Sequence, residues 1–416
     1  MSSCMHRRNF LKTCAGLAAA SPLARYQAMA APEKVRTKIR DIKVMVLQGP
    51  RTYTFIRVDT DSGISGIGEG YGFPGVGIKE GVLELRPYFI GKDPLEIEAL
   101  YAGLTTRIDG SAHMLLRAVS GIESALWDVA GKILDVPVAT LLGGRFRNRM
   151  RMYHDEGPRN MLDPASCREW AAKVKSDPAG WTAFKFGLPR TTPETDGARD
   201  AGNLSLLTSK ELRNIRQGFE NCREAIGWDY DLIVHCHWEH NLQTALQLVE
   251  AVAPIKPLWL EDPMPPDFSN AWVQLTSASK VPIGTGENLA RRQGFADFLL
   301  QKGLHIAQLD VRNTGGLLES KKIADLADLC LIPMAAHNTG SVLCNYATLQ
   351  WACSVRNFFA AETVIGRREW MDDVILHDGL VVKNGYITLP EKSGLGVDLN
   401  PDVVKAHLAK GEVYWS

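Results

Sequence analysis

In the stretch Asp231-Leu-Ile-Val-His-Cys-His-Trp-Glu-His-Asn241, a short apolar run is followed directly by a cluster of ionisable side chains. Residues 232–234 have the apolar, partly β-branched composition of a buried strand. The residues that follow include His235, Cys236, His237, Glu239 and His240. Because active sites often lie where a buried strand ends in such side chains, the stretch predicts one wall of a site.

Seven further apolar segments of this kind lie along the chain. In order, the eight candidate strands are residues 150–153, 183–186, 232–234, 257–260, 282–285, 306–309, 331–335 and 358–361. From the third onward they recur about every 25 residues, the size of one strand–helix unit. A polar insert near residues 190–209 lengthens the connection before the third strand. Eight such units predict an α/β fold with a (β/α)8-type barrel rather than an open sheet.

The segments outside this repeat have a different pattern. Residues 43–47 and 54–58 alternate like strands, and residues 116–134 have helical spacing, which predicts an α+β first part. We expect the glycine-rich loop at 70–77 to be a mobile cover over a site. After the barrel, a hairpin-like segment at 380–389 and a last helix near Pro401 are expected to pack back on the first domain.

Residues 1–31 are predicted to be a targeting segment rather than part of the fold. Arg7 and Arg8 precede a mildly apolar stretch, and Ala28-Met29-Ala30 has the A-x-A form of a cleavage site. Together these features resemble a Tat export signal, which predicts an exported, periplasmic protein. The alternative is a disordered N-terminal tail.

Composition excludes several classes of function. The formal net charge is +0 and no basic run is present, which argues against binding to nucleic acid or to an anionic membrane. The eight cysteines include no CxxC pair, so we expect mostly free, buried thiols. After the first 31 residues no apolar run approaches the length of a transmembrane helix. A hydrophobic content of 45% is enough for a large core.

Ionisable residues occupy nearly every predicted strand end. In chain order they are Lys185, His235 with His237, Glu261, Glu287, Asp310, His337 and Glu362. Active sites of barrels lie at this end of the strands. So many ionisable strand ends are difficult to explain as solvated loops, and they predict one shared catalytic site.

The chemistry that needs this set is removal of a proton next to a carboxylate. Such a proton is very weakly acidic, so a divalent cation must stabilise the charge that develops and a positioned base must take the proton. Glu261 and Glu287, on adjacent strands, are the expected oxygen ligands. His337, oriented by Asp310, is the expected base. Lys185 is expected to act as an electrophile, or as a second base if its pKa is lowered.

Eight short motifs are spread along the chain: Thr60-Asp-Ser-Gly-Ile-Ser-Gly-Ile-Gly-Glu69, Ala125-Leu-Trp-Asp-Val-Ala-Gly-Lys132, Leu141-Leu-Gly-Gly144, Leu258-Trp-Leu-Glu-Asp-Pro263, Gly286-Glu-Asn-Leu289, Gln308-Leu-Asp310, Ala336-His-Asn338 and Gly394-Leu-Gly396. Together these motifs resemble the enolase superfamily, in its mandelate racemase/muconate lactonizing branch. The resemblance implies a modified TIM barrel, (β/α)7β, with an N-terminal α+β capping domain and a Mg²⁺ requirement. The expected boundaries are 36–145 for the capping domain, 149–375 for the barrel, and 376–416 for the C-terminal segment that packs on the capping domain.

The resemblance also implies roles for single residues. Glu261 and Glu287 match the second and third metal ligands, and Asp310 with His337 matches the catalytic dyad. His237 matches the acid that protonates the leaving hydroxyl in acid-sugar dehydratases of the galactonate type. Glu362 matches a residue that faces the substrate carboxylate. The second basic position of the strand-two motif holds Gly187, which weakens a two-base racemisation.

One position departs from the family pattern. The first metal ligand of the family is an Asp or Glu, and here that position is His235. Three interpretations remain open: His235 binds the metal, it lies beside a site completed by water or Glu239, or the site has lost its function. Because imidazole is a poor ligand for Mg²⁺, the first interpretation admits Mn²⁺, Zn²⁺ or Fe²⁺.

We therefore expect a hydro-lyase that dehydrates a sugar acid, a small carboxylate substrate. A first alternative is an epimerase of a 2-hydroxy acid on the same scaffold, and a second is a non-catalytic sugar-acid-binding homologue. Tyr71, His154 and Trp238 are the further expected substrate contacts. The resemblance also implies a homo-oligomer.

Overall fold

The computed structural model describes residues 37–49, 51–72, 77–106, 113–189, 206–363 and 370–415. The predicted export signal, residues 73–76 of the glycine-rich loop and residues 190–205 of the polar insert lie outside the described residues. Within these ranges no helix has the length and apolarity required to cross a membrane.

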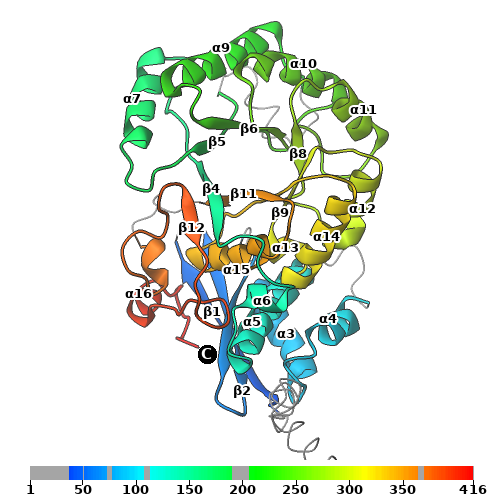
Figure 1. The fold of residues 1–416 in the computed structure, drawn as a ribbon, viewed down its shortest axis with the longest axis vertical. Helices are drawn as coiled ribbons and strands as arrows, with labels where there is room; N and C mark the ends of the chain where they lie inside the picture. Colours follow the sequence, from blue (N-terminus) through cyan, green and yellow to red (C-terminus); the bar gives the residue numbers. More distant parts are fainter. Residues whose placement is uncertain are drawn as a thin grey trace, which may run out of the picture.

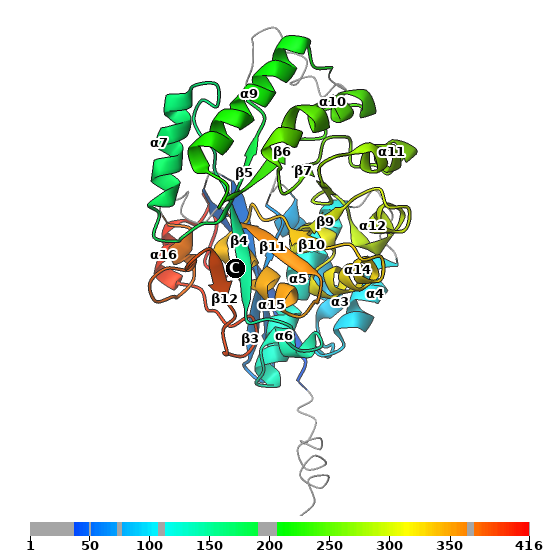
Figure 2. The same ribbon diagram turned by 45° about the horizontal axis from the view of Figure 1, so that its top comes forward.

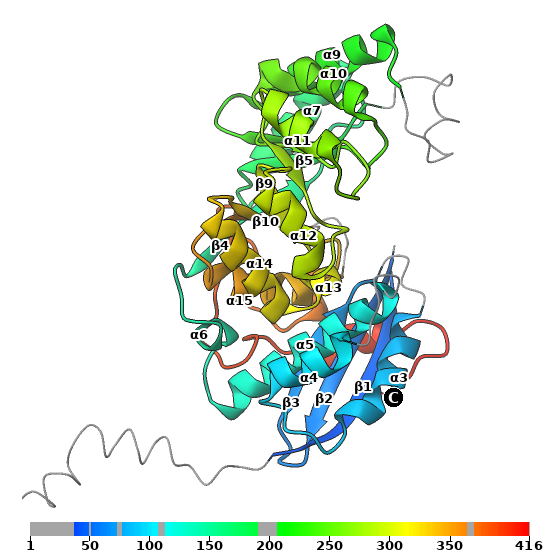
Figure 3. The ribbon, with the colours of Figure 1, turned by 90° about the vertical axis from the view of Figure 1, so that its right-hand side faces the viewer.

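The first part of the chain is an antiparallel sheet with helices packed on one face. Its elements are β1 (Ile39–Gln48), β2 (Thr52–Thr60), β3 (Ser65–Gly70), α3 (Ile78–Phe89), α4 (Ile97–Thr105), α5 (His113–Ile133) and α6 (Val138–Leu141). Figure 3 shows this part in blue and cyan beside the barrel. Both faces of β1 are buried: Ile42 and Val44 pack with the helices, whereas Met45 and Leu47 belong to the larger core shared with the barrel. The sheet is therefore the layer that joins the two parts.

Glycines on β3 allow α5 to lie directly against the sheet. A Cβ added at Gly66 would lie 2.3 Å from the carbonyl oxygen of Ala125, and one at Gly68 would lie 2.3 Å from that of Gly121. Because these atoms belong to a helix backbone, they cannot move aside as a flexible side chain could. The Gly-x-Gly spacing in this part of the sequence thus fixes how close α5 approaches.

Eight parallel strands form a closed barrel. They are β4 (Arg149–Asp155), β5 (Ala183–Gly187), β6 (Asp231–His235), β7 (Leu260–Glu261), β8 (Ile283–Thr285), β9 (Ile306–Leu309), β10 (Met334–Ala336) and β11 (Phe358–Thr363). They pair in sequence order, and β11 pairs with β4 to close the ring. This confirms the α/β fold class, with a parallel barrel and an N-terminal α+β capping domain.

Helices connect the barrel strands and cover their outer side, as Figure 1 shows. They are α7 (Pro164–Lys175), α9 (Ser209–Ile226), α10 (Leu242–Val252), α11 (Asn270–Ala278), α12 (Arg291–Leu300), α13 (Val311–Thr314), α14 (Leu317–Leu329) and α15 (Val342–Cys353), with a short 3-10 helix at Ala253–Ile255. Every residue of α15 is buried, because this helix lies between the barrel and the capping part. A helix that is enclosed on all sides needs no polar face, so its sequence lacks the amphipathic pattern of a surface helix.

Two predicted strands were placed too early along the chain. Residues 257–260 were expected, but β7 is Leu260–Glu261 and ends where Asp262 takes a positive φ of 47°. Residues 331–335 were expected, but Leu331 is exposed with a φ of 60°, so it belongs to a turn and β10 starts at Met334. Apolar character alone could not separate a turn residue from a strand residue here.

The C-terminal segment contacts the first strand of the barrel, β4, and the first strand of the capping part, β1. Of the hairpin expected at 380–389, only β12 (Tyr386–Thr388) forms a strand, and it pairs antiparallel with β4 at residues 149–151. A 3-10 helix at Asp372–Val374 and α16 (Pro401–Ala406) complete this segment, which Figure 2 shows in red beside β4. A bridge between Leu47 and Leu408 and a hydrogen bond from the Val46 nitrogen to Glu412 attach it to β1. The tail thus packs on the capping part, as expected.

Candidate active site at the strand ends

The barrel brings together the predicted strand-end residues. Parallel strands present their C-terminal ends at one edge, so residues far apart in sequence share one site. These residues are Lys185 on β5, His235 on β6, Glu261 on β7, Glu287 after β8, Asp310 after β9, His337 after β10 and Glu362 on β11. All are buried except His235, whose side chain is 12% exposed.

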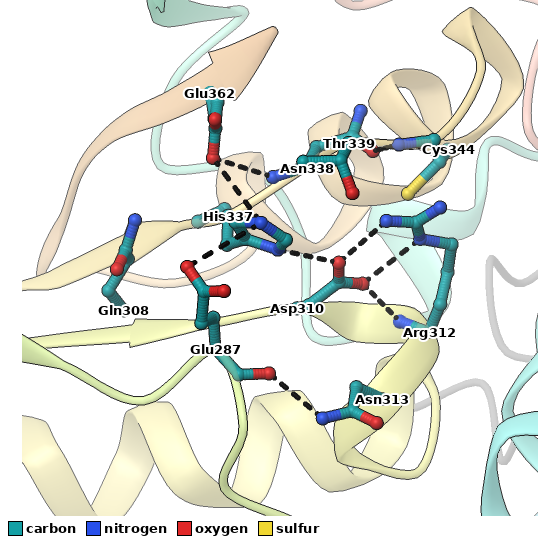
Figure 4. Close-up of polar contacts among 12 residues, drawn as sticks. Glu287, Gln308, Asp310, Arg312, Asn313, His337, Asn338, Thr339, Cys344 and Glu362 are labelled. Carbon is teal, nitrogen blue, oxygen red and sulfur yellow. Dashed lines mark hydrogen bonds and ion pairs between the residues drawn. The ribbon is translucent and has the colours of Figure 1, made fainter. Parts of the chain in front are cut away.

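His337 is oriented by Asp310 on the neighbouring strand (Figure 4). The Nδ1 of His337 lies 2.9 Å from Oδ2 of Asp310. Asp310 also accepts from Nε and Nη2 of Arg312, at 3.1 and 2.7 Å. Burial alone would raise the pKa of Asp310, but Arg312 and His337 hold it below its usual value. The ionised Asp310 therefore fixes the imidazole so that Nε2 is the free nitrogen.

The other nitrogen of His337 faces two carboxylates. Its Nε2 lies 3.5 Å from Oε2 of Glu287 and 3.8 Å from Oε2 of Glu362. Burial alone would lower the pKa of His337, but Glu287, Glu362 and Asp310 raise it to about 9. Burial raises the pKa of Glu362 to about 7, despite the nearby Lys185 and His337. The reactive side of His337 thus lies in a negative, enclosed environment.

Lys185 forms two buried ion pairs across the barrel. Its Nζ lies 2.6 Å from Oε1 of Glu261 and 3.0 Å from Oε2 of Glu362. Burial would lower the pKa of Lys185, but these two carboxylates outweigh it and raise the pKa well above the usual value. This environment is the opposite of the lowered pKa that a second base would need. Lys185 is therefore a persistent cation, suited to act as an electrophile.

Four residues form a group that can hold a metal ion. His235, Glu261, Asp262 and Glu287 each offer one donor atom, and these atoms lie within 4.8 Å of one another. Burial, with Lys185 and His237 nearby, lowers the pKa of His235 well below the usual value, which leaves the ring neutral. A neutral imidazole and carboxylate oxygens are suitable ligands for a divalent transition metal. The donors present therefore fit a divalent cation.

Glu261 is positioned by the barrel interior. The indole nitrogen of Trp259 donates to Oε2 of Glu261 at 2.8 Å. A Cβ added at Gly284 would lie 2.6 Å from Cδ1 of Trp259, so the glycine on β8 makes room for this indole. Oε1, which Lys185 contacts, is the oxygen of Glu261 on the side of His235, at 3.4 Å from its Nε2.

The capping part contributes residues to the same site. Glu69 on β3 pairs with Arg312 at 3.0 Å and accepts from the backbone nitrogen of Ser341 at 3.2 Å. Tyr71, an expected substrate contact, is buried, and its ring lies 6.5 Å from that of His337. The guanidinium of Arg312 lies 4.9 Å from the Tyr71 ring centre. The structure thus places Tyr71 directly beside the dyad.

A large cavity lies next to this group. Its volume is about 1180 Å³, and it extends over the ends of β4, β5 and β6 and the start of α7. Asp155, Gly187, His235, His237 and Glu239 are among its lining residues. The His237 ring centre is 4.0 Å from that of His235, and its side chain is 55% exposed. His237 therefore has access to a molecule in the cavity, and the mainly polar lining suits a hydroxylated one.

Two of the expected substrate contacts lie elsewhere. His154 is buried and stacks on Trp181, with ring centres 4.5 Å apart, and it is not among the residues that line the cavity. Strand alternation explains this, because His154 points to the helix side of β4 and its neighbour Asp155 reaches the cavity. Trp238 packs edge-on against His237, at 6.0 Å, and likewise does not line the cavity.

Some residues of the site were not identified from the sequence. Arg312 and Asp262 each follow a predicted site residue closely, and Glu69 ends a motif that was recognised only as a family signature. Proximity in sequence was the available signal for the first two. Their side-chain directions, however, depend on tight turns after the strands, which periodicity does not predict.

Comparisons with known proteins agree with this geometry. Residues 33–143 match the mandelate racemase/muconate lactonizing enzyme N-terminal domain, and residues 167–403 match the enolase C-terminal domain-like family. The chain is 34% identical over 378 residues to the D-xylonate dehydratase of Haloferax volcanii, covering 90% of each chain. It is 29% identical to the D-galactonate dehydratase of Xanthomonas oryzae pv. oryzae, covering 85% of this chain and 90% of that protein.

Solved structures show the same architecture. A mandelate racemase/muconate lactonizing enzyme-like protein from Rubrobacter xylanophilus superposes with a TM-score of 0.83 at 28% identity, covering 92% of this chain and 100% of that chain. A mandelate racemase/muconate lactonizing enzyme from Jannaschia sp. CCS1 superposes with a TM-score of 0.79 at 27% identity, covering 90% of this chain and 98% of that chain.

Proposed function

Because the chain belongs to the enolase superfamily, in its mandelate racemase/muconate lactonizing enzyme family, we propose that it is a metal-dependent dehydratase of a sugar acid. Two relatives are named for dehydration of sugar acids, D-xylonate and D-galactonate. The observation that carries the proposal is the dyad, in which Asp310 holds Nδ1 of His337 at 2.9 Å and leaves Nε2 facing the buried carboxylates.

In this proposal His337 takes the proton from the carbon next to the substrate carboxylate. Asp310 keeps the imidazole in the tautomer that can accept a proton at Nε2. Lys185, a buried cation, donates a hydrogen bond to the substrate oxygens on which negative charge develops. His237, at the cavity wall, protonates the departing hydroxyl, and Glu362 faces the substrate carboxylate.

We propose that Glu261, Glu287 and His235 hold a divalent cation. When bound, it would stabilise the negative charge on the substrate carboxylate after proton removal. Mg²⁺ is the metal that the family resemblance implies, whereas an imidazole ligand favours Mn²⁺, Fe²⁺ or Zn²⁺. The proposed test of activity therefore includes Mg²⁺, Mn²⁺ and Zn²⁺ in parallel.

The test is a library of sugar acids, including D-xylonate and D-galactonate, assayed for 2-keto-3-deoxy products. His337→Asn is expected to lower kcat by about 10³-fold, the usual contribution of a general base. The control is His377→Asn in the C-terminal segment, whose Nδ1 contacts the Gly379 carbonyl and which is expected to keep full activity. Full activity of His337→Asn would contradict the assignment of the base.

The same assay separates the alternatives. Exchange of the substrate proton in D₂O without loss of water would select the epimerase. The structure offers little support for it, because Gly187 carries no base and the ion pairs of Lys185 raise its pKa. Binding of sugar acids without turnover under every metal would select the non-catalytic homologue.

Two further properties are proposals of the same kind. We propose export by the Tat route on the basis of Arg7, Arg8 and Ala28-Met29-Ala30, tested by Arg7→Lys/Arg8→Lys and fractionation of the cell. We also propose a homo-oligomer, supported by the exposed Leu83 and Ile90 on and after α3. Ile90→Asp with light scattering tests it: a lower mass is expected, and a wild-type monomer would contradict it.

A further inference from the structure

Asp262 occupies an unusual position directly after β7. Consecutive side chains of a regular strand point to opposite faces, so Glu261 and Asp262 would be expected to diverge. Asp262 instead has a positive φ of 47°, which few residues other than glycine adopt. As a result its carboxylate lies beside that of Glu261 in the metal-binding group described above. Each residue of this group offers one donor atom, and these atoms lie within 4.8 Å of one another.

The backbone on both sides holds Asp262 in this conformation. Its nitrogen donates to the carbonyl oxygen of Gly284 on β8 at 2.9 Å. Its carbonyl oxygen accepts from the nitrogen of Trp238, in the loop after β6, also at 2.9 Å. Trp238 itself has a φ of 64°. Because uncommon backbone conformations persist where the surroundings fix them and often mark functional sites, this arrangement calls for a role for the Asp262 side chain.

Three buried polar atoms of the group point to a ligand. Asp262 is fully buried, and its Oδ1 accepts from Oγ1 of Thr285 at 2.5 Å. Within the described residues, Oδ2 of Asp262, Oε2 of Glu287 and Nε2 of His235 have no hydrogen-bond partner. Glu287 Oε2 and His235 Nε2 have only ion-pair contacts, the shortest of them with His337 Nε2 at 3.5 Å and with Glu261 Oε1 at 3.4 Å. Buried atoms of this kind are costly unless something pairs with them, and a shared cation is one partner that satisfies all three.

We propose that Asp262 is a metal ligand and supplies the carboxylate that His235 replaces on β6. The site would then consist of His235, Glu261, Asp262 and Glu287, one imidazole and three carboxylates. This inference rests on the divalent metal of the proposed function and goes beyond its three ligands. Mixed nitrogen and oxygen donors of this kind suit Mn²⁺ or Fe²⁺, whereas Mg²⁺ prefers oxygen alone.

Mn²⁺ is the probe for the test. A second group of metal-binding side chains, Cys236, Glu239 and His240, lies in the adjacent loop and contains a thiol. Soft, thiol-binding metals such as Zn²⁺ would also be drawn to that group, whereas Mn²⁺ prefers oxygen and imidazole donors. The affinity of the full chain for Mn²⁺ is measured by electron paramagnetic resonance of the free ion, which needs no substrate and no turnover.

Asp262→Asn is expected to weaken Mn²⁺ binding by at least about ten-fold, the loss typical of changes around a metal. The matched control is Asp328→Asn, the same change at a surface aspartate that pairs with Arg356 outside the metal group, and it is expected to change the affinity by less than about three-fold. Unchanged affinity in Asp262→Asn, or equal weakening in both variants, would overturn the proposal. If Asp262→Asn does not fold, Asp262→Gly, which suits the positive φ, replaces it.

A second variant pair tests the compensation directly. His235→Asp restores a carboxylate on β6, so Asp262→Asn should cost less than about three-fold in that background. An undiminished ten-fold loss there would show that Asp262 does not compensate for His235.

The outcome can be separated from that of the proposed function. His337→Asn, which does not remove a ligand, should lose dehydration but should not weaken Mn²⁺ binding by more than about three-fold. If no sugar acid is dehydrated, the Mn²⁺ affinity is still expected to depend on Asp262. Conversely, if the protein is an active dehydratase but Asp262→Asn does not change its Mn²⁺ affinity, only this inference is refuted.

Discussion

The Nζ of Lys185 lies 2.6 Å from Oε1 of Glu261, so an internal cation and the candidate metal ion share one carboxylate. Both residues are buried, at 1% and 0% side-chain exposure. The positive charge of this lysine reduces the net negative charge around the four residues that can hold the metal. It also keeps the buried carboxylates of Glu261 and Glu362 paired with a cation.

Removing this lysine should destabilise the metal-free protein. Lys185→Met leaves Glu261 and Glu362 buried without their cation, which typically costs about 3–5 kcal/mol. Saturating Mn²⁺ should recover part of the loss, because the metal offsets the charge on Glu261. Urea unfolding with and without Mn²⁺ measures both effects. Lys280→Met, which breaks an exposed pair with Glu250, is the control and should change the free energy of unfolding by less than about 0.5 kcal/mol.

The stability of the metal-free protein should depend on pH through His337. Its folded pKa is raised to about 9, above the ordinary value of 6.5. The stabilisation is therefore fully present below pH 6.5 and is lost as the pH rises through 9, by about 3 kcal/mol in total. Unfolding between pH 6 and 9.5 should show this slope, and His337→Asn should flatten it. An identical slope in the variant would assign it to another group.

Metal binding should release a proton from the same histidine. At pH 7.5 the metal-free His337 is protonated, because its pKa is about 9. A cation bound by Glu287 offsets the negative charge that raised this pKa, so the proton leaves and the base is ready to act. Calorimetry in buffers of different ionisation enthalpy counts the released protons. Wild type should release about one more proton than His337→Asn.

Arg312 should matter for catalysis through the dyad. Its guanidinium forks onto Asp310, with Nε and Nη2 each bonded to one carboxylate oxygen, and pairs with Glu69 through Nη1. Lysine cannot form this fork, so Arg312→Lys should loosen the orientation of Asp310 and lower kcat by about ten- to hundred-fold. Mn²⁺ affinity should be retained.

The control for this change is Arg356→Lys. Arg356 makes a similar fork with Asp328, but at the surface and away from the strand ends. Its replacement should leave kcat unchanged. A kcat for Arg312→Lys equal to that of wild type would mean that the fork does not position Asp310.

The packing of the capping sheet on α5 should be sensitive to one methyl group. Gly68→Ala would place a Cβ 2.3 Å from the Gly121 carbonyl oxygen, and overpacking of this kind typically costs about 1–3 kcal/mol. Thermal unfolding measures the loss. Gly187→Ala on β5, where the nearest atom is 3.8 Å away, should not be destabilised by such a contact.

Much of the fold and of the candidate site could be predicted because the relevant signals are local. Buried strands appear as short apolar runs, and their repeat at regular spacing predicts a parallel barrel. In a barrel the strand ends share one edge, so the positions of Glu261, Glu287 and His337 in sequence were enough to place them together. The predicted strand at 306–309 coincides with β9 for the same reason.

Tertiary structure decided what depends on turns and on charges from distant segments. The sequence could not show that Asp262 turns inward, since its positive φ is held by Gly284 and Trp238. Nor could it show that His154 points away from the cavity, or that two carboxylates from other strands raise the pKa of Lys185. The chemistry of each side chain is written in the sequence, but its direction and its charge depend on neighbours that only the closed barrel brings near.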